Sequence, residues 1–534
     1  MKQFFTTFIF LLFVITISYC QKYEYEVSLK PIDIPNLGGL QSYVVGTHDG
    51  EWLIIGGRLD GLHMRQPFAA FDEDGMNNHI IVVNPVTKKV WKTSISVLPS
   101  NIKEQFSSTN IQFYQEGDFL LMAGGYGYST SQDEHITFPY LTIVDIPNMI
   151  EAIKNEATIH NFIKQEKSEL FETSGGRLEK IGAVFYLVGG HKFTGRYNPM
   201  GPLHGPGFVQ EYTNEIRRFS IKIEDKIEIV HLPAIHDEIH LRRRDYNLLP
   251  QVKNGKEELI IFSGVFQPTV DLPFLYPVVI DGNSYHPVEN YIQYYNHYHC
   301  AALPIYNKGE DEMHNLFFGG ISQFYDEKGI IVQDDEVPFV NTIADVSRTS
   351  NGVFKEQKLS NNMPDLLGAG SEFIIMEHAP LYKDGVIDGD EICKKPVPVG
   401  YIYGGIKSSL PNIFFTNTGK ESNASSTIYQ VLIRKIKKKE FKTFDNKAIN
   451  LLIYPYPIDN AFRIAFDMDT LEDVEISVFN PDGKVIKTKK FFKKELQVGR
   501  NILLLEDFEL DFGTYLYRVL IGEKPFLQKV RMTE

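Results

Sequence analysis

The feature that most constrains the fold is a recurring apolar run that ends in paired glycines. Seven Gly-Gly pairs occur in 534 residues, whereas the glycine content would give roughly three by chance. Five pairs follow short runs rich in β-forming residues, as at Gly56 and Gly57, and a sixth run ends in Ser263 and Gly264. Apolar runs of this length that close in glycine predict buried strands, with glycine where backbones bend or approach closely.

The spacing of these glycines indicates one repeated unit. Successive second glycines are 68, 65, 74, 56 and 85 residues apart, at Gly57, Gly125, Gly190, Gly264, Gly320 and Gly405. This is a unit of about 50 residues with variable insertions, and it resembles the kelch repeat, whose four-stranded sheets are the blades of a β-propeller. The resemblance covers residues 21–437 and implies six blades. The aromatic positions that normally follow the glycines are poorly kept, with Trp91 the clearest match.

Each unit divides into four strands, A to D. In the first unit we expect them at residues 41–46, 52–56, 79–84 and 89–96. The last unit offers three strands up to residue 436, and no fourth follows before the chain changes character. The segment Tyr23–Ile32 has strand-like alternation and no other assignment. We predict that it supplies the missing outer strand and closes the ring, so that no sheet edge stays exposed.

The N-terminus predicts export. Lys2 precedes an apolar core at residues 4–17, which is too short to span a bilayer and has the form of a secretory signal ending at residue 20. A lipid anchor on Cys20 and an uncleaved anchor are the rival interpretations. After cleavage no other segment is expected to span a membrane. After cleavage only Cys300 and Cys393 remain, and two cysteines are too few for a fold held together by disulfides. The sequence leaves open whether these two residues pair.

The C-terminal region predicts a second domain. After a Lys-rich linker at 438–449, residues 450–534 show short strands separated by turn signals, which favours a small Ig-like β-sandwich. The region is similar to the C-terminal sorting domain of type IX secretion found in Bacteroidota, at residues 453–457, 482–484, 499–501, 513–515 and 529–530. The resemblance implies contact with that secretion machinery and a product released or held at the cell surface. An ordinary adhesive sandwich is the alternative.

Charge narrows the class of partner. Lys and Arg number 54 against 68 Asp and Glu, so the formal net charge is 54 − 68 = −14. Nucleic-acid binding requires clustered positive charge on one face, so the composition argues against a nucleic-acid partner. Apolar residues make up 43% and charged residues 23% of the chain, close to ordinary globular usage, which excludes bulk disorder.

The inserts between strands B and C are long and polar, and the propeller resemblance places them on one rim, where ligands are usually bound. An insert at residues 377–399 would lie on the opposite face. Basic and imidazole side chains suited to binding an anionic group occur beside this rim, and the candidate ligand-binding residues are Arg196, His204, Arg242, Arg243, Arg244 and His299. Alternatively, the consecutive arginines pair with Asp245 and neighbouring carboxylates and tie sheets together.

No metal or other cofactor is expected. His297 and His299 flank Tyr298 on an expected strand entry, which would place both imidazoles on one side, but no third ligand can be assigned. Some kelch propellers are copper-radical oxidases, and no residue set here can be matched to theirs. Phosphate-loop, zinc-protease and nucleophile-elbow motifs are also missing from the sequence.

Three function classes stay open at the level of sequence. The first is a non-catalytic surface module that binds an extracellular glycan or protein through the rim. The second is an extracellular carbohydrate-active enzyme, resembling the six-bladed kelch sugar epimerases, with Arg196, Arg243 or Arg244 orienting the substrate and His204, His240 or His299 moving a proton. The third is a structural surface protein. The first is the leading hypothesis, and the identity of the ligand and the oligomeric state are not encoded in any recognisable motif.

Overall fold

The computed structural model describes residues 23–66, 69–201, 207–223, 226–437, 446–456, 461–506, 510 and 512–532. The described chain is all-β, with two short α-helices, α1 (Ser100–Phe106) and α2 (Ile146–Lys154). The expected signal at 1–20, and residues 438–445 of the expected linker, lie outside the described residues. None of the helices in the described part is both long and apolar enough to cross a bilayer.

Within the described residues, six antiparallel sheets follow one another along the chain, each with a main path of four strands. Sheet 1 comprises β2 (Val44–His48), β3 (Glu51–Ile55), β4 (His79–Asn84) and β5 (Lys89–Ser94). Sheet 2 comprises β6 (Gln112–Glu116), β7 (Phe119–Ala123), β10 (Tyr140–Asp145) and β11 (Ile163–Lys167). Sheet 3 comprises β12 (Arg177–Ile181), β13 (Val184–Val188), β16 (Glu215–Ile223) and β17 (Ile227–His236). In each, the apolar run predicted from the sequence is the buried second strand.

Sheets 4 to 6 repeat this order. Sheet 4 comprises β18 (Asn247–Lys253), β19 (Lys256–Phe262), β20 (Val278–Ile280) and β21 (Tyr285–Pro287). Sheet 5 comprises β22 (Ala302–Asn307), β23 (Glu312–Ile321), β26 (Phe339–Arg348) and β27 (Phe354–Asn362). Sheet 6 comprises β28 (Leu366–Ile375), β31 (Val397–Ser408), β33 (Ile428–Lys437) and β1 (Tyr23–Ile32). The short strand β32 (Ser422–Ala424) also pairs with β31. Apolar side chains between neighbouring sheets form the core.

The first strands of the six sheets are connected by backbone hydrogen bonds that return to their starting point. Each bond joins a residue at or just before the first strand of one sheet to its counterpart in the next, with N···O distances of 2.8–3.4 Å. The bonded residues, in the order of the ring, are Ser42, Asn110, Gly175, Asp245, His299, Gly370 and again Ser42. We call this the six-membered backbone ring, and it shows that sheet 6 lies next to sheet 1.

The paired glycines allow neighbouring sheets to approach one another. A Cβ atom on Gly124 would lie 2.0 Å from the carbonyl oxygen of Thr173, and one on Gly319 would lie 1.8 Å from that of Leu367. Both glycines also have positive φ, 67° and 68°, which L-residues rarely adopt. The glycine pattern in the sequence therefore reflects contact between the backbones of consecutive sheets.

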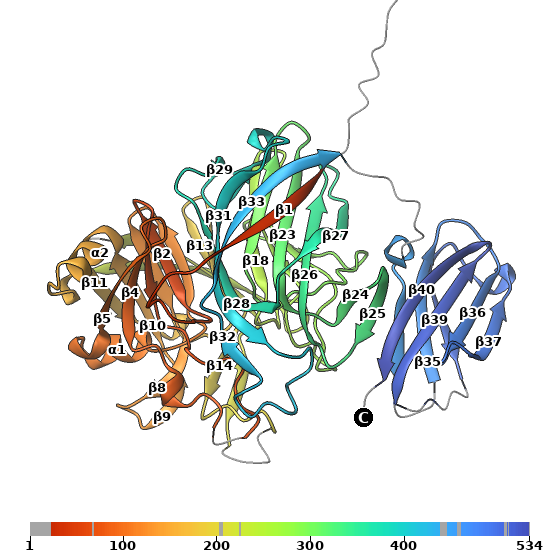
Figure 1. Ribbon diagram of the computed structural model, residues 1–534, viewed down its shortest axis with the longest axis horizontal. Coiled ribbons are helices and arrows are strands. Elements are labelled where there is room, and N and C mark those ends of the chain that lie inside the picture. The colour runs from red at the N-terminus through yellow and green to blue at the C-terminus, as the bar shows by residue number, and fades with distance from the viewer. Residues whose placement is uncertain are drawn as a thin grey trace, which may run out of the picture.

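The N-terminal strand completes sheet 6. β1 pairs antiparallel with β33 from Tyr23 opposite Lys437 to Ile32 opposite Ile428, and the two strands lie side by side (Figure 1). Tyr25 and Val27 are buried in the core shared by sheets 5 and 6. The sequence prediction that this segment supplies the missing outer strand is confirmed.

The C-terminal region folds around its own core. It contains β34 (Leu452–Tyr456), β35 (Ala461–Met468) and β38 (Gly499–Leu505) in one sheet, and β36 (Val474–Phe479), β37 (Val485–Phe491), β39 (Gly513–Ile521) and β40 (Lys524–Met532) in a second. Side chains from both sheets, including Phe466 and Tyr517, form a single buried cluster. This arrangement of two packed sheets agrees with the predicted sandwich.

Candidate functional site

The inserts between second and third strands gather at one end of the sheets. Those of sheets 2 and 3 form an additional four-stranded sheet of β8 (Tyr126–Ser129), β9 (Glu134–Thr137), β14 (His191–Thr194) and β15 (Val209–Tyr212). β8 and β9 lie at the lower end of the view in Figure 1. The expectation of one loop-rich end is met for these two units.

The other inserts make contact at the same end. Asn417 Nδ2 in the insert of sheet 6 donates to the carbonyl oxygen of Leu62 in that of sheet 1, at 2.8 Å. The insert of sheet 1 reaches that of sheet 3 in turn, because Arg196 Nε donates to the carbonyl oxygen of Ala70 at 2.8 Å. Neighbouring inserts thus support one another, which turns flexible connections into an ordered surface. We call this surface the rim.

The insert at 377–399 is placed elsewhere. Its strands β29 (Leu381–Lys383) and β30 (Val386–Asp388) extend sheet 5, since β30 pairs in parallel with β22. Figure 1 shows β29 at the end of the molecule opposite β8 and β9. The sequence expectation for this exceptional insert agrees with the structure.

Aromatic rings and the guanidinium groups of Arg242 and Arg244 meet where the rim inserts reach the six-membered backbone ring. Arg244 Nε donates to the Tyr212 hydroxyl at 3.2 Å, and Arg244 is ion-paired with Asp245. The imidazole of His63 contacts the ring of Tyr197 edge-on, with centroids 4.8 Å apart. We call the following set the rim cluster: His63, Tyr197, Tyr212, Arg244, Asp245 and Tyr298, which are coupled electrostatically through Arg244.

The environment of the rim cluster fixes its charge state. Burial, together with Arg244 and Arg58, lowers the pKa of His63 to about 4, so this imidazole is neutral at pH 7. Burial opposes the charge of Arg244, but Tyr212 and Asp245 outweigh it and raise the pKa of the guanidinium group. Burial raises the pKa of Tyr298 well above its usual value. In the rim cluster Arg244 therefore stays charged, whereas His63 and Tyr298 are neutral at pH 7.

The three consecutive arginines of the sequence have three different environments. Arg243 is fully buried, and its guanidinium group donates to the carbonyl oxygens of His240, Ser263 and Tyr276 at 2.7–2.8 Å. Arg242 donates to the carbonyl oxygen of Phe266 at 2.6 Å and lies 3.9 Å from the centre of the Tyr212 ring. Arg242 thus contacts the rim cluster through Tyr212, Arg244 lies within it, and the expected pairing with Asp245 is found at Arg244 alone.

The other predicted ligand-binding residues are dispersed. Arg196 lies on the rim, donates to the carbonyl oxygen of Ala70 and approaches Asp72 at 3.6 Å. His204 lies outside the described residues. His299 contacts Glu372 instead. Among the described residues, Arg196, Arg243 and His299 contact different partners, and a ligand site shared by these residues stays a prediction.

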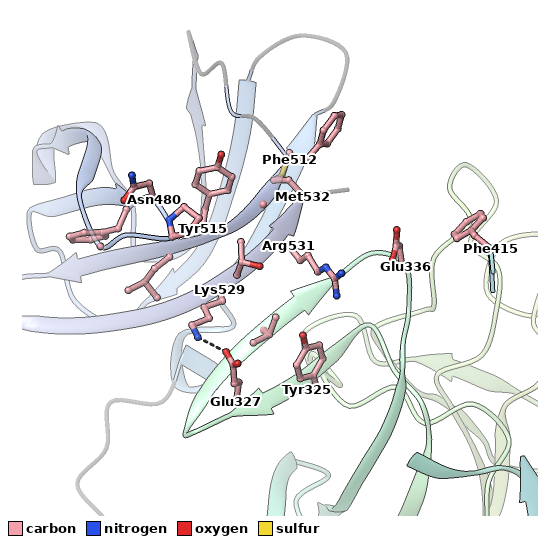
Figure 2. Close-up of a pocket in the computed structure, with 17 residues that line it drawn as sticks. Tyr325, Glu327, Glu336, Phe415, Asn480, Phe512, Tyr515, Lys529, Arg531 and Met532 are labelled. Atoms are coloured by element: carbon pink, nitrogen blue, oxygen red, sulfur yellow. Dashed lines mark hydrogen bonds and ion pairs between the residues drawn. The ribbon is translucent and has the colours of Figure 1, made fainter. Parts of the chain in front are cut away.

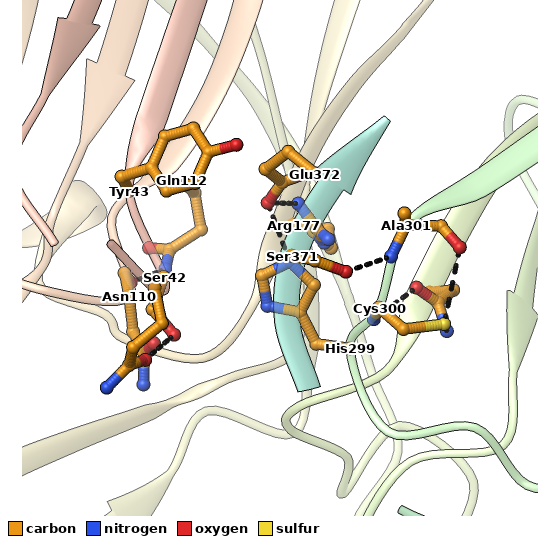
Figure 3. A network of polar contacts seen from close by, with 12 residues as sticks. Ser42, Tyr43, Asn110, Gln112, Arg177, His299, Cys300, Ala301, Ser371 and Glu372 are labelled. Atoms are coloured by element: carbon orange, nitrogen blue, oxygen red, sulfur yellow. Dashed lines mark hydrogen bonds and ion pairs between the residues drawn. The ribbon is translucent and has the colours of Figure 1, made fainter. Parts of the chain in front are cut away.

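His299 belongs to a polar network among the inner strands. Its Nε2 lies 2.6 Å from Glu372 Oε1, and Arg177 Nη1 lies 3.4 Å from the same carboxylate oxygen. Figure 3 shows these three side chains converging from three separate segments of the chain. We call them the inner triad. Arg177 and Glu372 were missed in the sequence, where each is the second residue after a residue of the six-membered backbone ring, Gly175 and Gly370.

Two carboxyl groups around Arg177 have opposite properties. Burial acts to raise the pKa of Glu372, but Arg177 and His299 outweigh it, and the pKa is lowered. For Glu179, one alternation further along β12, burial dominates over Arg177 and Lys383 and raises the pKa to about 7. At neutral pH Glu372 is therefore ionised, whereas Glu179 populates both its protonated and its ionised form.

The paired-histidine expectation is corrected by the backbone. His297 has φ of 47°, and the strand begins only at Ala302, so alternation does not apply to His297 and His299. His297 is buried and stacks on Phe317, away from Glu372.

Within the described residues no group of three or more His, Cys, Asp or Glu side chains could hold a metal ion. Cys300 is buried, Cys393 is exposed, and both are free thiols.

Comparisons with known proteins identify the C-terminal region. Residues 452–531 match the family described as secretion system C-terminal sorting domain. No curated protein matches the chain at a significant level. Among solved structures, one titled "Structure of YjhT" is 9% identical, with a TM-score of 0.39, covering 75% of this chain and 98% of its own. A fungal alcohol oxidase of the AA5 family in complex with copper is 8% identical, with a TM-score of 0.35. The match covers 96% of this chain and 100% of the oxidase chain.

The family match covers all five motifs that suggested a type IX sorting domain, and it confirms that part of the sequence analysis. Residues 452–531 are a secretion-system sorting domain, which implies contact with the secretion machinery, and the protein is secreted or attached to the cell surface.

Proposed function

We propose that residues 23–437 form a six-bladed kelch-like β-propeller, in which sheets 1 to 6 are the blades. The six-membered backbone ring supports this proposal, because it returns to Ser42 after six steps. The pairing of β1 with β33 supports it further, since closing the last blade with the N-terminal strand removes an exposed edge.

We further propose that this scaffold is a binding module for an extracellular glycan or protein, with the rim as its ligand-binding face. The rim cluster is the observation that carries the proposal. Aromatic rings stack on the apolar faces of sugars or peptide side chains, and a guanidinium group orients a polar or anionic group beside them. Ordered inserts on a closed scaffold hold such groups in place before binding, which lowers the entropy cost of association.

A binding screen with matched variants tests this proposal. The mature protein is applied to a glycan array and to extracellular protein fractions, alongside Tyr212→Ala in the rim cluster and Tyr382→Ala on β29 at the opposite end. We expect the wild type and Tyr382→Ala to share a ligand that Tyr212→Ala binds at least about tenfold more weakly, the loss typical of an aromatic contact residue. Equal binding by Tyr212→Ala and the wild type would exclude the rim cluster as the site.

The inner triad and Glu179 favour a second candidate function, an enzyme that acts on an extracellular sugar. Glu372, with a lowered pKa, and Glu179, with a pKa raised to about 7, both interact with Arg177, and general acid–base catalysis commonly uses two carboxyl groups whose pKa values differ in this way. Any ligand found in the screen is therefore followed by NMR for turnover. Turnover abolished in Glu179→Gln and retained in Tyr382→Ala would favour the enzyme, whereas an unchanged ligand spectrum would favour the binding module.

A further inference from the structure

The sorting domain is attached to the rest of the protein by a strand pair as well as by the chain. The insert of sheet 5 forms a hairpin of β24 (Phe324–Glu327) and β25 (Ile330–Asp334). β25 pairs in parallel with β40, from Ile331 opposite Gln528 to Asp334 opposite Arg531. The hairpin and the sorting domain therefore share one six-stranded sheet, and Figure 1 shows β25 beside β40.

Buried polar side chains fix the register of this pair. Gln528 Nε2 donates to Gln333 Oε1 at 3.0 Å, and both side chains are buried. The fully buried carboxylate of Asp334 lies 3.4 Å from Arg531 Nη1 and also accepts from Asn412 Nδ2 at 3.2 Å. If the sorting domain left, Asp334 would lose its only ion-pair partner among the described residues.

A surface ion pair and an apolar patch extend the contact. Lys529 binds Glu327 at the exposed margin of the strand pair, as Figure 2 shows. Behind it, the hydroxyl of the buried Tyr294 donates to the carbonyl oxygen of Leu451 at 2.6 Å. Around this bond an apolar cluster combines both parts of the molecule: Ile292, Tyr294, Phe324, Ile331, Leu452 and Ala465.

The contact is narrow in comparison with those between the six sheets. A pocket of about 1180 Å³ lies between the hairpin and the sorting domain, with Tyr325, Glu336, Tyr515 and Arg531 among its lining residues (Figure 2). The domains thus meet along a strand edge and one apolar patch, and they are not packed together over the whole facing surface. Each side also has its own core, so separation requires neither to unfold.

We propose that the edge of β25 is a strand-binding site whose occupant is β40 of the sorting domain, and that the two domains stay bound to each other after the chain between them is cut. Adding a strand to a sheet edge gives affinity through backbone hydrogen bonds and specificity through side chains. Here the specificity comes from the Gln333–Gln528, Asp334–Arg531 and Glu327–Lys529 pairs. Scission of residues 438–445 alone therefore does not release the sorting domain.

Cutting the folded protein tests this inference. A protease recognition site is inserted within residues 438–445 of the full chain, and the folded protein is cleaved and passed over a size-exclusion column. We expect the two fragments to elute together at about 10 μM, as a complex with a Kd in the micromolar range or below would. Separate elution of two folded fragments at that concentration, with circular dichroism confirming both folds, would overturn the proposal.

A charge exchange at the margin tests the register. Glu327→Lys and Lys529→Glu are each expected to weaken the cleaved complex about threefold, within the range measured for exposed ion pairs. Combining them should restore the affinity to within about twofold of the wild type. Lys524→Glu, on the same strand but outside the four paired residues, should leave it unchanged. Failure of the double variant to recover, or an effect of Lys524→Glu equal to that of Lys529→Glu, would contradict the proposed strand pairing.

Discussion

Two distant strand pairings hold this chain together, and they differ in what they complete. β1 pairs with β33 over ten residue pairs and buries Tyr25 and Val27, which are 3% and 1% exposed. β40 pairs with β25 over four and already belongs to a finished sheet with β39. The first pairing supplies a missing part of a core, and the second joins two cores that are complete without it. We therefore expect the first to be needed for folding and the second to act between folded parts.

Removing β1 is the most severe test of this comparison. Deletion of Tyr23–Ile32 opens the edge of β33 and uncovers part of the core between sheets 5 and 6. The expected loss in the free energy of unfolding is more than about 5 kcal/mol, beyond the range of ordinary single substitutions. Differential scanning calorimetry should show the main transition collapse while the sorting domain keeps its own. An unchanged main transition would mean that β1 is not part of the cooperative unit.

A methyl group added between sheets 5 and 6 tests how closely the backbones of neighbouring sheets approach one another. Gly319→Ala places a Cβ 1.8 Å from the carbonyl oxygen of Leu367, and we expect a loss of more than about 3 kcal/mol in chemical denaturation. Gly182→Ala is the matched control, because Gly182 has a similar positive φ, 57°, but no atom within 4 Å of the added Cβ. It should cost only about 1 kcal/mol. If both variants lost the same free energy of unfolding, the destabilisation would come from the positive φ and not from the contact between sheets.

The burial of Glu179 predicts that the stability of the six sheets depends on pH. The sorting domain, which does not contain Glu179, should not share this dependence. The pKa is raised to about 7 in the folded state, from a usual value of 4.5. Because the folded state holds the proton more tightly, Glu179 costs stability progressively as the pH rises from 4.5 to 7. Glu179→Gln should therefore stabilise the main transition more at pH 8 than at pH 5, by about 1–2 kcal/mol. Denaturant titrations at both pH values give this difference, and a pH-independent effect would contradict it.

Removing the sorting domain should have the smallest effect on stability. A chain that ends at residue 449 loses the β25–β40 pair and the contacts of Asp334 with Arg531, but no part of the six-sheet core. We expect the melting temperature of the main transition to fall by a few degrees at most, corresponding to about 1 kcal/mol. The same chain should accumulate in the periplasm, since it lacks the sorting domain. A collapse of the main transition comparable to that on deleting Tyr23–Ile32 would erase the distinction between the two pairings.

Much of the strand layout could be predicted because it depends on local pattern. The expected strands at 52–56, 79–84 and 89–96 match β3, β4 and β5 to within two residues. The segment around His297 was misassigned because a buried polar loop that enters the ring has the same residue types as a strand entry. The β25–β40 pair was not anticipated, because nothing in either segment specifies a partner about 200 residues away.

The candidate site was less predictable. Arg242, Arg243 and Arg244 are equivalent in sequence, yet one stacks on Tyr212, one is buried among carbonyl oxygens, and one joins the rim cluster. Their roles depend on the direction in which each side chain leaves an irregular turn, which no periodicity describes. The inner triad was accessible in principle, since Arg177 and Glu372 occupy the same offset in two repeats.

The sequence alone determined that the protein is exported, that it consists of repeated apolar strands closed by glycine, and that a sorting domain follows. These properties reside in short segments whose physical requirements, such as an apolar core or freedom at positive φ, are local. The tertiary structure decided which strands from distant repeats meet, which of several basic side chains keep an accessible charge, and that the sorting domain docks on β25. Those outcomes depend on burial and on partners contributed by remote segments, and both exist only once the sheets have come together.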